Sequence, residues 1–218
     1  MGKIKQGILG GFSGKVGTVV GSFWKGRSTM RALAPNVHNP KTEGQEAARA
    51  RFALVGRFSK NVLAFINNGY KHMASAMALT GPNCFMRNCL ATAISGSGTA
   101  VTLDYTRVPL TAGNGLLNVE SPSVQAAAAG HSVNVSWTNN AGISTDVLDD
   151  DMVLLCLYNP SKQESTYDMQ SATRVDQAAV ITYPATWAGD TVYLYLATES
   201  ANQQRISNST MVGSVTAI

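Results

Sequence analysis

Short β-branched and aromatic runs in residues 99–218 constrain the fold most strongly. Six such runs stand at fairly even intervals, with turn residues between them: HSVNVSW, MVLLCLYN, ESTYDM, QAAVITY, DTVYLYLAT and STMVGSVTAI. Even spacing of short strands is typical of an all-β sandwich. In TVYLYLAT, Val192, Leu194 and Leu196 alternate with two tyrosines, so one face of this strand is expected to belong to a core. Trp137 and Trp187 are placed to fill that core.

Residues 41–95 are expected to be helical. Thr42-Glu43-Gly44-Gln45 follows Pro40 and has the capping-box pattern of a helix start. This helix is expected to end at Asn67-Asn68-Gly69, and to bury one apolar stripe formed by Ala48, Phe52, Val55, Val62 and Ile66. A second helix is expected to end at Gly81-Pro82. NCFMRNCLATAI predicts a third helix with Cys84 and Cys89 in the core, and SGSG at 95–98 predicts a linker.

The first forty residues combine glycine with apolar side chains. GILGGFSGKVGTVVGSFWKG contains seven glycines in twenty residues. KVGTVVGSF and RSTMRAL both suit extended structure, and Lys25-Gly26 between them suits a tight turn. We therefore predict an extended arm or β-hairpin over 1–40, helices over 41–95 and an Ig-like sandwich over 99–218, which is an α+β fold. An exposed apolar surface is normally covered by a partner, which predicts an assembly interface of Phe12, Val16, Val19, Val20, Phe23 and Trp24.

Charge is divided unevenly along the chain, although the net charge is only +4. Residues 1–90 hold 13 Lys/Arg and two acids, whereas residues 91–218 hold four Lys/Arg and eleven acids. Such a division predicts either contact with nucleic acid or docking of the basic end of one copy on the acidic end of the next. The candidates for contact with an anionic partner are Lys15, Lys25, Arg27, Arg31, Arg49, Arg51 and Arg57.

Motifs for catalysis or cofactor binding are missing. Gly14-Lys15 is followed by Val16 rather than Ser or Thr, which excludes a P-loop. Gly14-Lys15-Val16-Gly17 matches the GXXG loop of KH-type RNA binders, but no β–α framework of that kind surrounds it. Asp146 and Asp149–Asp151 lack the spacing of a calcium loop. His38, His72 and His131 have no catalytic companions nearby. We expect no enzyme, no catalytic residue, no cofactor and no metal.

Targeting segments are also missing. The first residues have no signal-peptide pattern, and no run approaches the length of a membrane helix. The expectation is synthesis in a bacterial cytoplasm without a membrane partner.

The N-terminal sequence MGKIKQGILGGFSGKVGTVVGSFWKG closely resembles the start of a large uncharacterised family from Bacteroidetes genomes. NPKTEGQEAARARF, followed by GPNCFMRN, is similar to a segment of phage and prophage proteins. Their N-P-x-T-x-x-Q-x-x-x-R-x-x-F pattern is filled here by Asn39, Pro40, Thr42, Gln45, Arg49 and Phe52. Gly81, Asn83 and Phe85 fill the next element, whereas Asn88 stands one place early. The resemblance implies a virion-type or prophage-derived structural protein with an Ig-like tail domain.

Two functions from different classes follow. The first is a non-enzymatic, self-assembling structural protein of a phage-like virion or filament, whose N-terminal arm docks on a neighbouring identical subunit; other virion proteins are further possible partners. The alternative is a nucleic-acid-binding protein that uses the basic N-terminal half. A surface adhesin is a third reading, and the missing signal peptide counts against it.

Overall fold

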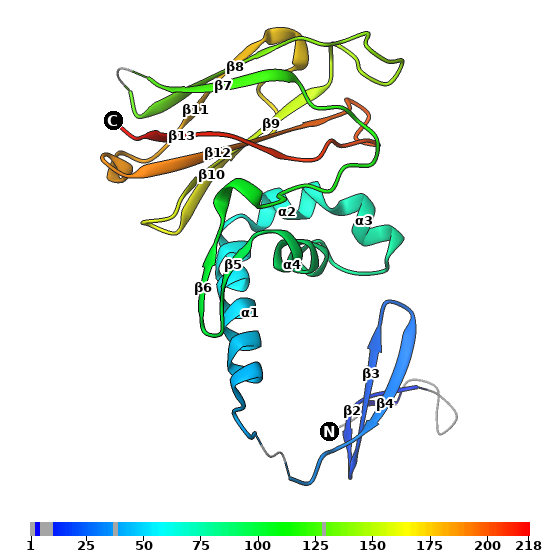
Figure 1. The fold of residues 1–218 in the computed structure, drawn as a ribbon. Helices are drawn as coiled ribbons and strands as arrows, with labels where there is room; N and C mark the ends of the chain where they lie inside the picture. The colour runs from blue at the N-terminus through cyan, green and yellow to red at the C-terminus, as the bar shows by residue number, and fades with distance from the viewer. Residues whose placement is uncertain (1–2, 5–10, 37–38, 128–129) are drawn as a thin grey trace. The chain divides into compact units, whose positions relative to one another are not determined.

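The computed structural model describes residues 3–4, 11–36, 39–127 and 130–218, so His38 lies outside the described residues. The chain divides into two compact units, Met1–Thr42 and Glu43–Ile218 (Figure 1). The helical segment and the β-rich segment share the second unit.

The N-terminal unit is an antiparallel four-stranded meander. Its strands are β1 (Lys3–Ile4), β2 (Phe12–Val16), β3 (Val19–Trp24) and β4 (Arg27–Ala32), and they lie in the order β1-β2-β3-β4. Lys25 (φ 43°) and Gly26 (φ 82°) both have positive φ angles, as a two-residue hairpin turn of type I′ requires. The predicted β-hairpin around Lys25-Gly26 is therefore confirmed, with two further strands before it.

The second unit begins with four helices, which are α1 (Glu43–Asn61), α2 (Leu63–Gly69), α3 (Lys71–Ala76) and α4 (Gly81–Thr92). The expected helix start after Thr42 and the expected end at Gly69 are both found, with an interruption at Val62. The prediction that Gly81-Pro82 closes a helix was wrong. These residues open α4 instead, because proline fits the first turn of a helix and the Thr80 hydroxyl accepts a hydrogen bond from the Asn83 amide.

Residues 95–98 are not a linker, in contrast to the sequence prediction. They lie in an antiparallel hairpin formed by β5 (Ile94–Ser97) and β6 (Ala100–Leu103). Gly98 (φ 59°) provides the left-handed turn conformation that the loop needs. A Ser/Gly run can therefore form a tight turn as readily as a flexible connection.

The rest of the second unit is a sandwich of two antiparallel sheets. Its strands are β7 (Glu120–Ala126), β8 (Ser132–Thr138), β9 (Met152–Asn159), β10 (Glu164–Asp168), β11 (Ala178–Thr182), β12 (Thr191–Glu199) and β13 (Thr210–Thr216). The strand orders are β11-β8-β7 and β10-β9-β12-β13, with connections that cross between the sheets as in Ig-like sandwiches. The predicted α+β fold is confirmed, and all six predicted strand runs form strands. Strand β7 was missed because ESPSVQA is polar and contains a proline.

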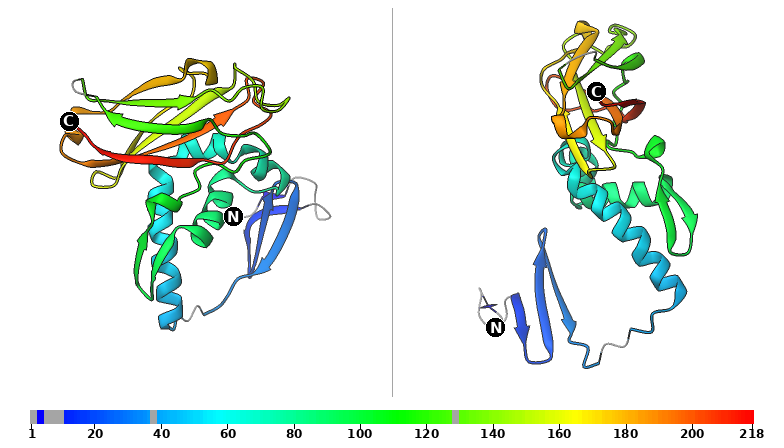
Figure 2. Two further views of the ribbon diagram at one scale, coloured as in Figure 1. Left: turned by 45° about the horizontal axis from the view of Figure 1, so that its top comes forward. Right: turned by 90° about the vertical axis from the view of Figure 1, so that its left-hand side faces the viewer.

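The four-stranded sheet is buried on both faces, so this unit has three layers (Figure 2). On β9 and β12, Leu155, Leu157 and Leu194 pack toward the three-stranded sheet, where Trp137 and Trp187 lie as predicted. The alternate residues of the same strands pack against the helices; they are Leu154, Cys156, Tyr158, Tyr195 and Ala197. The alternation in β12 predicts one core face, and the second face is buried by the helical layer.

The N-terminal half of α1 does not bury the predicted apolar stripe. The first buried residue of this helix is Val55, and Phe52 is 55% exposed. The prediction of a buried Phe52 was therefore wrong. The helical periodicity identifies one face correctly, but the layer that covers this face begins only near Val55.

Candidate functional site

The described residues of the N-terminal sheet form no buried core. Within residues 11–36 and 39–42, only Gly21 is buried, and every other described side chain is exposed or half-buried. A stable sheet ordinarily packs at least one face against another layer. The two faces of this sheet are therefore the strongest candidate for a functional surface.

One face of the sheet is apolar. Residues directly opposite each other in an antiparallel sheet lie on the same face, and neighbours along a strand alternate. Val16 pairs with Val19, Gly21 pairs with Met30, and Phe23 pairs with Ser28. Val16, Phe23 and Met30 are 49%, 64% and 70% exposed, which are high values for apolar side chains on one surface.

Gly21 allows Phe12 to pack on this apolar face. A Cβ atom added to Gly21 would collide with the Phe12 carbonyl oxygen and would lie 2.7 Å from two carbons of the Phe12 ring. The absence of a side chain therefore lets strand β2 approach β3 closely. This contact explains one of the glycines in the N-terminal sequence and leaves Phe12 half-buried.

The opposite face is basic. Lys15 pairs with Val20, and Val20 pairs with Arg31, so these three residues form one row across the sheet. Trp24 and Arg27 form another cross-strand pair. Between these rows, the hydroxyl oxygens of Ser22 and Thr29 lie 2.5 Å apart in a hydrogen bond. Trp24 is 57% exposed, and Lys15, Arg27 and Arg31 are exposed.

The predicted interface residues are thus divided between two surfaces. Phe12, Val16, Val19 and Phe23 share the apolar face, whereas Val20 and Trp24 lie on the basic one. Met30 was missed, although the Lys25-Gly26 turn fixes the register that places it opposite Gly21. Counting alternate residues from that turn would have identified it.

The predicted anion-binding residues are also divided. Lys15, Arg27 and Arg31 share the basic face, and Lys25 lies in the adjacent turn. The remaining three belong to α1 in the second unit and are exposed there; they are Arg49, Arg51 and Arg57.

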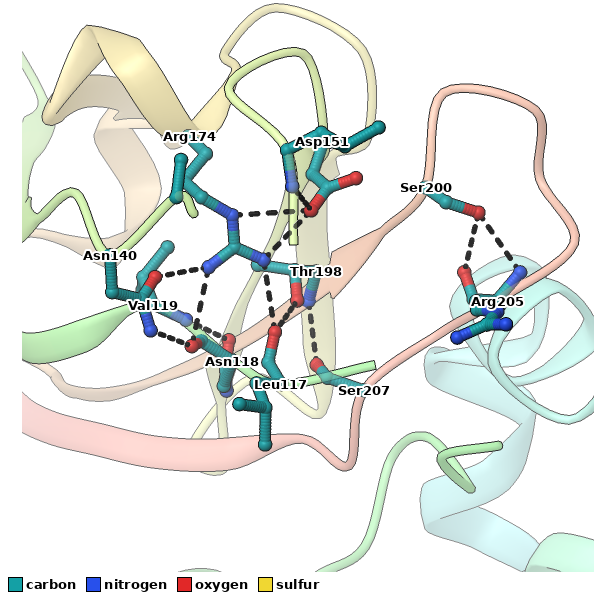
Figure 3. Close-up of polar contacts among 12 residues, drawn as sticks. Leu117, Asn118, Val119, Asn140, Asp151, Arg174, Thr198, Ser200, Arg205 and Ser207 are labelled. Carbon is teal, nitrogen blue, oxygen red and sulfur yellow. Dashed lines mark hydrogen bonds and ion pairs between the residues drawn. The ribbon is translucent and has the colours of Figure 1, made fainter. Parts of the chain in front are cut away.

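Arg174, in the short 3-10 helix Arg174–Asp176, is a fully buried charged residue of the second unit. Its guanidinium donates to the Asp151 carboxylate, to the Asn140 side chain and to the Leu117 and Asn118 carbonyl oxygens (Figure 3). These contacts use all five N–H donors that an arginine has. Arg174 therefore holds loops of the sandwich together and has no donor left for a ligand.

The described residues contain no cluster of three or more His, Cys, Asp or Glu side chains that could hold a metal ion. All three cysteines are buried; burial raises the pKa of the Cys89 thiol to about 12 and that of Cys156 further. The thiols of Cys89 and Cys156 are therefore protonated at neutral pH and are poor nucleophiles. His72 and His131 each contact a backbone carbonyl oxygen.

Three of the four aspartates singled out in the sequence have partners within the second unit. Asp146 forms an ion pair with Arg205, Asp149 accepts a hydrogen bond from Asn139, and Asp151 binds Arg174. The segment that contains these aspartates is the loop between β8 and β9.

The fold defines a two-unit α+β protein with an Ig-like sandwich and a small sheet that has one apolar and one basic face. Residues 11–213 match a family of unknown function, DUF6266, and the chain belongs to that family. No curated protein and no solved structure matches the chain. None of the described helices is both long enough and apolar enough to span a bilayer.

Proposed function

We propose that this is a non-enzymatic, self-assembling structural protein in which the N-terminal sheet docks on a neighbouring subunit. The observation that carries the proposal is the apolar face of the N-terminal sheet, on which the described side chains of Val16, Phe23 and Met30 are exposed. The occupant we propose is the same face of a second copy. The resemblance to phage and prophage proteins favours assembly into a virion-type particle made in the bacterial cytoplasm, with other virion proteins as further partners.

Charge favours contact through the apolar faces. Residues 1–42 hold seven Lys/Arg and no acid, so two such sheets repel each other in most orientations. Lys15, Arg27 and Arg31 lie on the basic face. When two apolar faces stack about 10 Å apart, as sheets in sandwiches do, these cations point outward into solvent. The repulsion is then screened by water and salt.

Pairing through the edge of β4 is less favourable. All six residues of β4 are exposed, and the strand lies at an edge of the sheet. An antiparallel pair of β4 strands centred on Thr29 would place Arg27 of each copy opposite Arg31 of the other. Charged side chains on edge strands ordinarily prevent such pairing.

The energy of one face-to-face contact is modest. Val16, Phe23 and Met30 are 49–70% exposed, so burying them contributes roughly 1–2 kcal/mol per side chain. Two copies together gain about 6–12 kcal/mol, against an association cost of about 4–15 kcal/mol. A single pair is therefore weak, and lasting association requires several contacts in a larger assembly.

Analytical ultracentrifugation of the full chain tests the proposal. We expect concentration-dependent oligomers that the Phe23→Ser/Met30→Ser variant abolishes. The matched control is Ile143→Ser/Val180→Ser, which removes equally exposed apolar side chains from the second unit and leaves association unchanged. A wild-type chain that stays monomeric up to about 1 mM would contradict the proposal. Its association free energy would then be weaker than roughly −4 kcal/mol.

A further inference from the structure

We propose that the basic face of the N-terminal sheet binds single-stranded nucleic acid. This face includes Lys15, Val20, Ser22, Trp24, Arg27, Thr29 and Arg31. It lies opposite the apolar face, so the inference holds whether or not the protein assembles through the apolar face.

The spacing of the cations suits a short stretch of a phosphate backbone. Arg27 and Arg31 are four residues apart in β4, or about 13 Å at the rise of an extended strand. Lys15 lies in the same row as Arg31 but two strands away, which is about 10 Å. No acid occurs in residues 1–42 to oppose a polyanion. The hydroxyls of Ser22 and Thr29 lie between the two rows; one of them donates to the other, and the remaining hydroxyl hydrogen can donate to a phosphate or sugar oxygen.

Trp24 distinguishes a single strand from other polyanions. Its side chain is 57% exposed and lies opposite Arg27 on the same face. An indole on a flat, basic sheet surface provides a platform for an unstacked base, whereas the bases of a duplex are already stacked on each other. The aromatic surface therefore favours single-stranded over double-stranded nucleic acid.

The acidic end of another copy fits this face less well. Residues 91–218 contain eleven Asp and Glu side chains. Nine of them already accept a hydrogen bond or form an ion pair within the second unit. These nine are Asp104, Asp146, Asp149, Asp151, Glu164, Asp168, Asp176, Asp190 and Glu199. These side chains would have to exchange their present partners to bind the basic face, whereas the phosphates of a single strand have no such partners to lose.

Fluorescence anisotropy of the full chain with a labelled oligothymidylate of about 16 nucleotides tests the inference. Three phosphate contacts predict a slope of log affinity against log salt of about −2, or roughly a 20-fold loss between about 50 and 200 mM salt. Trp24 emission should be quenched on binding, because a stacked base covers the exposed indole. Trp24→Ala should weaken binding by about 5- to 150-fold with little change in slope.

Charge variants complete the design. Arg27→Gln/Arg31→Gln should reduce the slope to about −0.7, while Arg27→Lys/Arg31→Lys keeps the charges and the slope. Arg107→Gln, an exposed position in the second unit, is the matched control and should bind like the wild type. The salt slope and the quenching of Trp24 emission are measured on the wild-type chain. They therefore test the inference even if a variant misfolds.

Three results would overturn the inference. One is no measurable binding of the oligonucleotide by the wild-type chain at about 50 mM salt. Another is a duplex of equal length bound as tightly, with Trp24→Ala neutral. The last is oligomers that dissociate in Arg27→Gln/Arg31→Gln without oligonucleotide binding by the wild type, which would assign the basic face to an acidic protein surface. Loss of oligomers in Phe23→Ser/Met30→Ser alone concerns the apolar face and leaves this inference intact.

Discussion

Replacing Arg174 with methionine should destabilise the second unit strongly, because it leaves one buried group, the Asp151 carboxylate, without its ion-pair partner. Methionine has a comparable length but no charge and no N–H donor. The Leu117 carbonyl oxygen also accepts from the Thr198 hydroxyl at 2.9 Å, and the Asn118 carbonyl oxygen accepts from Asn140 at 3.0 Å. Both carbonyls therefore keep a partner after the substitution.

The cost falls on Asp151. Its side chain is fully buried, and without Arg174 its carboxylate retains only the hydrogen bond from the Leu148 amide, at 3.0 Å. Removing one partner of a buried ion pair typically costs about 3–5 kcal/mol. Arg174→Met should lower the free energy of unfolding by this amount, or the melting temperature by roughly 6–20 °C for a unit of this size.

Urea unfolding followed by tryptophan fluorescence measures the effect. Trp137 and Trp187 are buried in the sandwich, and the Trp137 indole donates to the Arg174 carbonyl oxygen at 2.9 Å. Asp151→Asn/Arg174→Met should recover about 2–3 kcal/mol, because no isolated charge remains. Arg205→Met is the matched control and should cost at most about 1 kcal/mol, since its ion pair with Asp146 is exposed. A loss below about 1 kcal/mol for Arg174→Met, or no recovery in the double variant, would refute this reasoning.

Three further predictions concern packing and pH. Gly21→Val should destabilise the N-terminal sheet by about 1–3 kcal/mol, because the new side chain meets a backbone carbonyl and an aromatic ring; faster trypsin cleavage there measures this. Burial raises the pKa of Cys89 and of Tyr158 to about 12. As pH rises, these two groups therefore ionise in the unfolded chain before they ionise in the folded one. The free energy of unfolding should be constant below about pH 8.5 and fall toward pH 12 by up to about 1.4 kcal/mol per pH unit per group. The midpoints of urea unfolding at each pH would show this fall. Phe52→Ala should change the unfolding free energy by less than about 0.5 kcal/mol, whereas Phe58→Ala, in the core, should cost about 3–5 kcal/mol in the same assay.

The sandwich was the most predictable part of the fold, because strand patterns depend on local alternation. The run at 152–159 forms strand β9 without a change in its ends, since continuous apolar residues mark a strand buried on both sides. Strand β7 was missed because backbone pairing with β8, rather than its own residues, specifies it. The exposure of Phe52 depends on where a distant layer ends, which helical periodicity alone does not report.

The candidate site was predictable in position but not in organisation. Sequence reasoning located an exposed apolar and basic segment in the first forty residues, and it grouped Phe23 and Trp24 as one interface. Adjacent residues of a strand point to opposite faces, so these two side chains cannot share one contact surface. The sequence prediction treats apolar character as a property of a segment, whereas a strand divides that character between two faces.

This division makes each neighbour a control for the other. Phe23→Ser should reduce self-association and leave the affinity for a single-stranded oligonucleotide unchanged, because the basic face keeps its residues. Trp24→Ala should reduce that affinity and leave self-association unchanged. Both substitutions remove an aromatic side chain from the same exposed strand, β3, so a general loss of the sheet would affect both measurements in both variants. If each variant loses both self-association and oligonucleotide affinity, the two faces do not act independently. Two independent faces require that Phe23→Ser loses only self-association and that Trp24→Ala loses only oligonucleotide affinity.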